Sequence, residues 1–241
     1  MRTTIRYFDS RRLRRLVTIA VFCAMAYACQ FIFHIRVAFL TFDAKDAIMA
    51  IGSMMFGPLT GVAMSLTVAT LELTISDTGI YGFIMNVASS MVFTVVSALI
   101  YRRLRTMKGA VLGLFAAVLS VTAVMMALNL LVTPYYMGCS VGEVVALIPA
   151  LLLPFNLTKA TLNAGLVLVL YKPLAVALRK AKVRTGRLGS AAPQPAEQKA
   201  DAKPVEKFRL DRTTVTVFLS GLLIVAICLA IFLGYLNGSF S

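Results

Sequence analysis

The feature that most constrains this chain is a series of long apolar runs separated by short basic segments. Runs of about 20 apolar residues match the thickness of a bilayer when they are helical. Of the 241 residues, 59% are hydrophobic and 14% are charged, whereas a soluble domain usually carries about 25% charged residues. The sequence therefore predicts an all-α integral membrane protein, and it largely excludes soluble enzymes, nucleic-acid-binding proteins and secreted disulfide scaffolds.

The formal net charge of +14 comes from Lys and Arg residues that cluster between the apolar runs. Of these 24 basic residues, six lie in residues 2–15, four in 102–108 and eleven in 172–212. Such clusters are typical of loops that stay on the cytoplasmic side of a membrane. No motif for reading bases or phosphates accompanies them, so we expect no nucleic-acid partner.

The apolar runs predict a six-helix membrane domain followed by one additional C-terminal transmembrane helix. The seven expected helices cover residues 16–33, 46–56, 58–75, 79–100, 109–133, 144–170 and 215–236. Residues 1–15 are then a basic cytoplasmic N-terminus and 16–182 the membrane domain. Residues 183–212 are expected to form a disordered cytoplasmic linker, and 213–241 the additional helix. This arrangement puts the N-terminus in the cytoplasm and the C-terminus outside.

The second and third helices come from one apolar stretch, residues 47–75, which Gly57 and Pro58 interrupt. If this stretch crossed the membrane once, the basic cluster at 102–108 would lie opposite the N-terminal arginines. Two helices keep all three clusters on one side. Residues 46–56 would then reach across only about half of the hydrocarbon at ~1.5 Å per residue. We therefore expect a half-length helix, buried against its neighbours beside a cavity.

Strongly polar side chains within the expected helices gather in the half of the membrane that faces away from the cytoplasm. They are Glu72, Asn86, Asn129, Asn156 and Lys159. Asn156, Lys159 and Asn163 also share one helix face, because they are spaced i, i+3, i+7. Two interpretations stay open. The groups form an outward-facing pocket for a small molecule, or they join helices structurally, with Lys159 paired to Glu72.

Residue patterns for catalysis and for metal binding are missing from the sequence. His34 is the only histidine, the four cysteines lack metal-ligand spacing, and no glycine-rich phosphate loop occurs. We therefore expect no enzyme activity and no metal site, so transport would need energy from another chain. Ala20, Ala24 and Ala28 recur every fourth residue, which lets a partner helix approach closely.

Several short motifs together resemble the S components of energy-coupling factor vitamin transporters, in particular the riboflavin type. They lie, in the family's order, within residues 16–180. They are FLTFDAKD at 39–46, FGPLTG at 56–61, GIYGFIMN at 79–86, LN at 128–129, PFNLTK at 154–159 and LYK at 170–172.

The resemblance implies a binding subunit in the bacterial cell membrane that captures riboflavin (or FMN) from outside. Its partners would be a transmembrane coupling protein, the T component, and two ABC ATPases that use ATP. The chain would need no cofactor of its own. Carried over by position, Asn129, Asn156 and Lys159 bind the flavin ring. The remaining site residues that the resemblance implies are Leu40, Thr41 and Phe42, which close over the ligand, Tyr81 and Asn86 in the binding site, and Ala20 and Ala24 against the coupling protein.

Two features depart from the family pattern. Glu72 stands where a neutral amide is expected, and residues 183–241 lie outside the match. Two alternatives therefore stay beside the riboflavin hypothesis. The chain could be an S component for folate, thiamine or pantothenate, or a structural membrane protein whose polar side chains only pack together.

Overall fold

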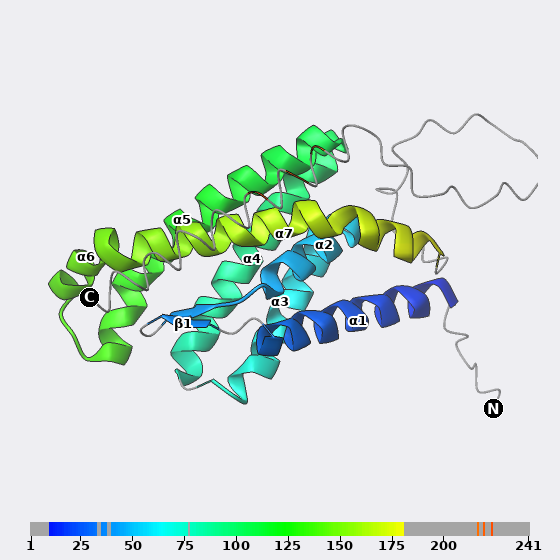
Figure 1. Cartoon of the computed structure of the whole chain (residues 1–241). Coiled ribbons are helices and arrows are strands. Elements are labelled where there is room, and N and C mark those ends of the chain that lie inside the picture. Colours follow the sequence, from blue (N-terminus) through cyan, green and yellow to red (C-terminus); the bar gives the residue numbers. More distant parts are fainter. Residues whose placement is uncertain are drawn as a thin grey trace, which may run out of the picture.

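A computed structural model describes residues 10–32, 35–37, 40–76 and 78–180, together with residues 216, 219 and 223 (Figure 1). Within these residues the chain is helical apart from one short hairpin. In chain order the elements are α1 (Ser10–Ile32), β1 (Ile35–Val37), β2 (Leu40–Phe42), α2 (Lys45–Phe56), α3 (Pro58–Leu73), α4 (Gly79–Leu104), α5 (Met107–Met137), α6 (Val141–Leu147), the π-helix η1 (Ile148–Leu152) and α7 (Leu153–Lys180).

The first helix begins earlier than the apolar run that predicts it. α1 starts at Ser10 rather than at residue 16, so Arg15 lies within the helix. The Arg15 guanidinium donates a hydrogen bond of 2.8 Å to the carbonyl oxygen of Phe56, at the end of α2. A second donor contact of 3.4 Å reaches the Thr60 hydroxyl on α3. Arg15 therefore ties the start of α1 to the junction of α2 and α3.

The segment after α1 is the main departure from an all-helical expectation. Strands β1 and β2 pair antiparallel, with Ile35 opposite Phe42 and Val37 opposite Leu40. Ile, Val, Thr and Phe, which favour strands, make up much of this segment. In Figure 1 the hairpin extends from the end of α1 toward the end of the bundle where α6 lies.

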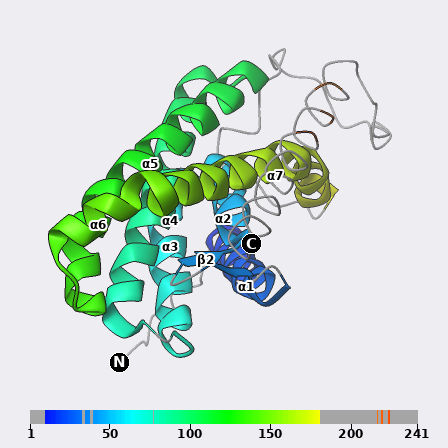
Figure 2. The ribbon, with the colours of Figure 1, turned by 60° about the vertical axis from the view of Figure 1, so that its left-hand side comes forward.

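The predicted half-length helix occupies the centre of the fold. All twelve residues of α2 are buried, and α2 packs against α1, α3, α4 and α7 (Figure 2). Gly57 separates α2 from α3 and adopts φ 109° and ψ 163°, a backbone conformation that is nearly restricted to glycine. Pro58 then begins α3, where its missing N–H costs no hydrogen bond. The break that was predicted at Gly57 and Pro58 is thus confirmed, as is the burial of α2.

Helices α4 and α5 form a closely packed pair because α5 carries a glycine at their crossing. A Cβ atom added to Gly113 would lie 2.8 Å from the backbone carbonyl oxygen of Ser97 on α4. No side chain fits at this point. The glycine therefore lets the two backbones approach in the way that small residues do between membrane helices.

The predicted helix at 144–170 is longer than expected and is not uniformly α-helical. It begins at Val141, contains the five-residue π-helix η1, and continues as α7 to Lys180. Pro149 lies inside η1, where it cannot donate the hydrogen bond of a regular α-helix. Pro154 lies in the first turn of α7, so α7 begins directly beside the polar motif at 154–159.

Four stretches within the described residues are long and apolar enough to cross a membrane. They are Arg15–Ile32, Gly79–Leu104, Met107–Met137 and Val141–Tyr171. α2 and α3 have 12 and 16 residues, which is shorter than the about 20 residues of a full span. The length and composition of these helices fit a multi-pass membrane protein, whereas the count of six helices plus one stays a prediction. Nearly all of the expected linker and seventh helix lies outside the described residues.

Candidate functional site

A cavity of about 290 Å³ lies between the hairpin and the helices. This volume is near the lower end of the range for small-molecule sites, about 300–1,000 Å³. Seven of the eight ligand-binding residues that the sequence suggests line the cavity. They are Leu40, Thr41, Tyr81, Asn86, Asn129, Asn156 and Lys159. The structure thus brings together residues of β2, α4, α5 and α7 that are far apart in the sequence.

Phe42 is the exception among the residues expected at the ligand. It is not part of the cavity lining. Its ring packs edge-on against Phe155, with the ring centroids 5.9 Å apart, and it joins Leu162 in a small apolar cluster. Leu40 and Thr41 reach the cavity lining. Phe42 instead packs against Phe155, a residue of that lining, and does not itself line the cavity.

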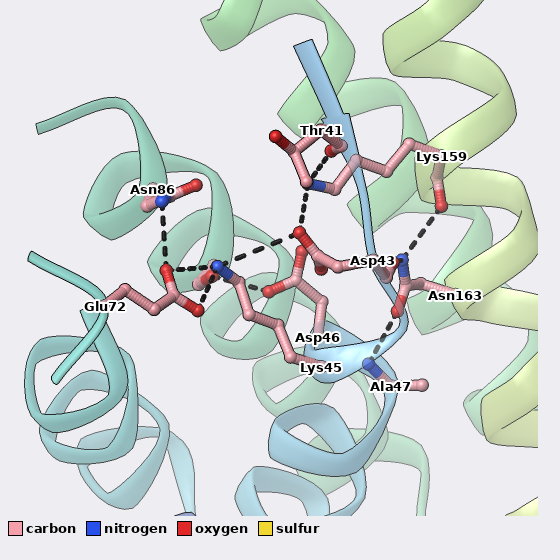
Figure 3. Close-up of polar contacts among 10 residues, drawn as sticks. Thr41, Asp43, Lys45, Asp46, Ala47, Glu72, Asn86, Lys159 and Asn163 are labelled. Carbon is pink, nitrogen blue, oxygen red and sulfur yellow. Dashed lines mark hydrogen bonds and ion pairs between the residues drawn. The ribbon is translucent and has the colours of Figure 1, made fainter. Parts of the chain in front are cut away.

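Lys159 is paired with the loop that follows β2. Its ammonium group lies 2.8 Å from Asp43 Oδ2 and donates a hydrogen bond of 3.0 Å to the carbonyl oxygen of Thr41. Figure 3 shows these contacts joining α7 to the end of the hairpin. The Lys159 side chain is 13% exposed, so it is accessible from the cavity. The suggested structural pairing of Lys159 with Glu72 is wrong.

Glu72 has a different basic partner, which the sequence did not single out. The Lys45 ammonium donates to both carboxylate oxygens of Glu72. Asn86 Nδ2 donates a further hydrogen bond of 2.9 Å to Glu72 Oε2. Figure 3 shows Lys45 between Glu72 on one side and Asp43 on the other. The ammonium of Lys45 is 3.8 Å from Asp43 Oδ2, so the two ion pairs form one connected cluster.

Asp43 is the most unusual acceptor in the cavity wall. It lines the cavity, and its Oδ1 atom is buried without a hydrogen-bond partner. Burial by itself would raise the pKa of the Asp43 carboxyl, but the ammonium groups of Lys159 and Lys45 outweigh burial and hold that pKa below its usual value. The carboxylate is therefore charged, and its Oδ1 atom is enclosed in the wall.

Two asparagines of the cavity wall, Asn129 and Asn156, form side-chain hydrogen bonds only within their own helices. Asn129 donates to the Met125 carbonyl oxygen at 2.7 Å, and Asn156 donates to the Leu152 carbonyl oxygen at 2.8 Å. Both bonds stay within one helix. Neither amide is therefore held by a hydrogen bond to a neighbouring helix, which does not fit a purely structural polar cluster.

Asn163, by contrast, joins helices. Its side-chain oxygen accepts a hydrogen bond of 2.9 Å from the backbone N–H of Ala47 in the first turn of α2. Its amide nitrogen donates to the Asp43 carbonyl oxygen at 3.0 Å. The first N–H groups of a helix have no partner inside the helix, and Ala44, which precedes α2, offers no side-chain cap. The structural interpretation is therefore right for Asn163.

Sequence analysis missed several further polar residues of the cavity wall. They are Gln30, Asp43, Lys45, Ser76, Thr78, Ser89, Thr133 and Tyr136. The sequence carried one signal for these residues. The charges of Asp43, Lys45 and Asp46 alternate in sign at the start of an otherwise apolar helix. No group of three or more potential metal ligands occurs within the described part of the chain.

The expected docking alanines lie on the surface of the described bundle. Ala20 and Ala24 are both exposed on α1, one helical turn apart. Neither lines the cavity. The exposed alanines of α1 and the cavity lining are therefore separate parts of this fold.

The fold and the cavity together define a helical membrane protein that can enclose a small ligand. Residues 14–171 match the family described as "ECF transporter, substrate-specific component". The match covers most of the chain, and the chain belongs to this family. It is thus the substrate-capturing component of a transporter and not an enzyme.

Two relatives agree with this family assignment. The chain is 27% identical to "Riboflavin transporter RibU" of Staphylococcus aureus (strain TCH60) over 184 residues, which cover 73% of this chain and 97% of the relative. It also resembles the solved structure titled "Structure and mechanism of the S component of a bacterial ECF transporter", with a TM-score of 0.61 and 27% identity. That likeness covers 70% of this chain and 99% of the other.

Proposed function

We propose that this chain captures riboflavin from outside a bacterial cell for uptake. The observation that carries the proposal is the meeting of Asn129, Asn156 and Lys159 at one cavity, with no hydrogen bonds from the two amides to other helices. The similarity to a riboflavin transporter along most of the chain supports it.

The chemistry of these three side chains suits one edge of a flavin ring. That edge alternates carbonyl acceptors with an N–H donor. An asparagine amide both donates and accepts, whereas a lysine ammonium only donates. Asn129 and Asn156 would contact the N–H and its flanking carbonyls, and Lys159 would donate to a carbonyl or a ring nitrogen. Leu40, Thr41, Tyr81 and Asn86 would surround the rest of the ligand.

Uptake would require partners that supply energy. We propose a transmembrane coupling protein, which contacts α1 through Ala20 and Ala24, and two ABC ATPases that hydrolyse ATP. The exposure of both alanines supports this docking face. The three basic clusters support a cytoplasmic N-terminus and, with a seventh helix, an external C-terminus.

The first test is a titration of the detergent-purified protein with riboflavin, followed by calorimetry and by the flavin absorption spectrum. We expect binding, and we expect Lys159→Met to weaken it by about 10-fold or more, because hydrogen bonds to charged groups contribute about 1.5–3 kcal/mol. Asn156→Ala should weaken it as well. Lys108→Met, at an exposed position outside the cavity, is the matched control.

A protein that binds no flavin would contradict the riboflavin proposal. Folate, thiamine and pantothenate belong in the same titration, because binding of one of them would keep the family and change the ligand. If no vitamin binds, and Lys159→Met changes only the stability, the cavity is structural.

A further inference from the structure

The charged side chains in the cavity wall are balanced in pairs. Four of the lining residues carry a full charge: Asp43, Lys45, Glu72 and Lys159. Lys45 is bound by both oxygens of Glu72, and Lys159 lies 2.8 Å from Asp43. Among the described residues that line the cavity there is no arginine. Each ammonium group therefore has its own carboxylate, and no positive charge is left for an anionic ligand.

The carboxylates make the wall rich in hydrogen-bond acceptors. Asp43 Oδ1 is buried and has no hydrogen-bond partner. The Asp46 carboxyl group is also buried next to this loop and accepts a hydrogen bond from the Ser90 hydroxyl. Hydroxyl groups of a ligand can donate to carboxylates such as Asp43 and Glu72, which line the cavity. A phosphate dianion has only acceptors and would meet carboxylates.

We propose that Glu72 is a specificity-determining residue that makes this site select the uncharged flavin, riboflavin, over its phosphate ester FMN. This inference rests on the proposed function. By holding Lys45 with both carboxylate oxygens, Glu72 removes the cation that a phosphate group would otherwise use. Burying a charged phosphate without a free cationic partner is unfavourable. Glu72 is 4% exposed, so water cannot readily screen its charge.

The test compares the dissociation constants for riboflavin and FMN in the purified full-length protein and in a Glu72→Gln variant. Glutamine keeps the shape of the side chain but removes the charge of the carboxylate to which Lys45 donates, so that Asp43, 3.8 Å from the Lys45 ammonium, stays as its acidic neighbour. We expect the wild type to bind FMN about 10-fold or more weakly than riboflavin, and the variant to lose most of this difference. Glu143→Gln removes the same charge at an exposed position of α6, outside the cavity, and should keep the wild-type ratio.

The possible failures can be told apart. If the wild type binds riboflavin and FMN equally, the specificity inference is wrong and the proposed function stands. If the wild type discriminates but Glu72→Gln keeps the same ratio, Glu72 is not the selective residue. If the wild type binds neither flavin, the proposed function is wrong, and the inference falls with it. Equal binding of riboflavin and FMN by the wild type would overturn the inference even if the variant does not fold.

Discussion

In the described part of the chain, each of the two lysines that line the cavity has a carboxylate partner from a distant segment. Lys159 of α7 contacts Asp43 of the loop after β2, and Lys45 of α2 contacts Glu72 of α3. Asp43 and Lys45 thus lie in one short segment, where the negative charge of Asp43 contacts α7 and the positive charge of Lys45 contacts α3. Buried ion pairs of this kind add little net stability, but removal of one partner is costly, because an unpaired charge stays behind.

The structure predicts that Lys45→Met strongly destabilises the protein. Lys45 is 3% exposed, and its loss leaves Glu72 without a counter-charge. We expect the free energy of unfolding in detergent to fall by about 3–5 kcal/mol. Glu72→Gln combined with Lys45→Met should recover part of this loss, since no buried carboxylate is then left at position 72. An effect no larger than that of Lys108→Met at the exposed cluster would contradict this account.

At the scale of the helices, the fold is organised around α2, which is short and wholly buried. α2 and α3 follow each other at Gly57, whose backbone conformation no other residue adopts easily. The first turn of α2 is satisfied by Asn163 from α7, and its last turn is contacted by Arg15 from α1. A helix that is too short to cross the bilayer is thus held at both ends by long helices.

We therefore expect Gly57→Ala to lower the free energy of unfolding by about 1–3 kcal/mol through backbone strain. An added Cβ atom would meet no other atom within 4 Å, so the effect would come from the backbone alone. Gly142→Ala is a suitable comparison, because its Cβ atom would meet only Ser140 Oγ at 3.9 Å. Chemical unfolding of both variants measures the difference, and equal stabilities would rule out strain at Gly57.

For the whole molecule, the cavity and the exposed face of α1 are formed by different residues, so the proposed ligand capture and the proposed coupling would take place at separate sites. The lining residues come from the hairpin and several helices, whereas Ala20 and Ala24 lie outside the cavity lining. If the proposed docking face is right, the two activities can be changed independently by substitution.

A bulky side chain at position 24 should therefore stop uptake without changing riboflavin binding. We expect Ala24→Phe to abolish riboflavin uptake by the assembled transporter, because phenylalanine prevents the close approach of a partner helix. Ala123→Phe on the exposed surface of α5 introduces the same side chain away from α1 and should leave uptake intact. Uptake assays in vesicles and titration of the purified variants measure the two activities. Normal uptake by Ala24→Phe would exclude this face.

The sequence by itself determined those features that depend on local composition. Apolar runs predict membrane helices wherever they occur, and Gly57 and Pro58 interrupt a helix whatever surrounds them. The polar residues of the expected helices were likewise visible, because a polar group in an apolar run is costly anywhere in a membrane. For this reason the sequence alone indicates Asn129, Asn156 and Lys159 as candidate site residues, although their role in binding stays a prediction.

Only the tertiary structure decided which of these polar groups contact one another. Lys159 and Asp43 are 116 residues apart, and nothing in the local sequence favours Asp43 over Glu72 as the partner of Lys159. The same holds for Asn163, which caps α2, and for Phe42, which packs against Phe155 and does not line the cavity. Partner choice depends on how helices from distant parts of the chain pack together, because hydrogen bonds and ion pairs form only over a few ångströms.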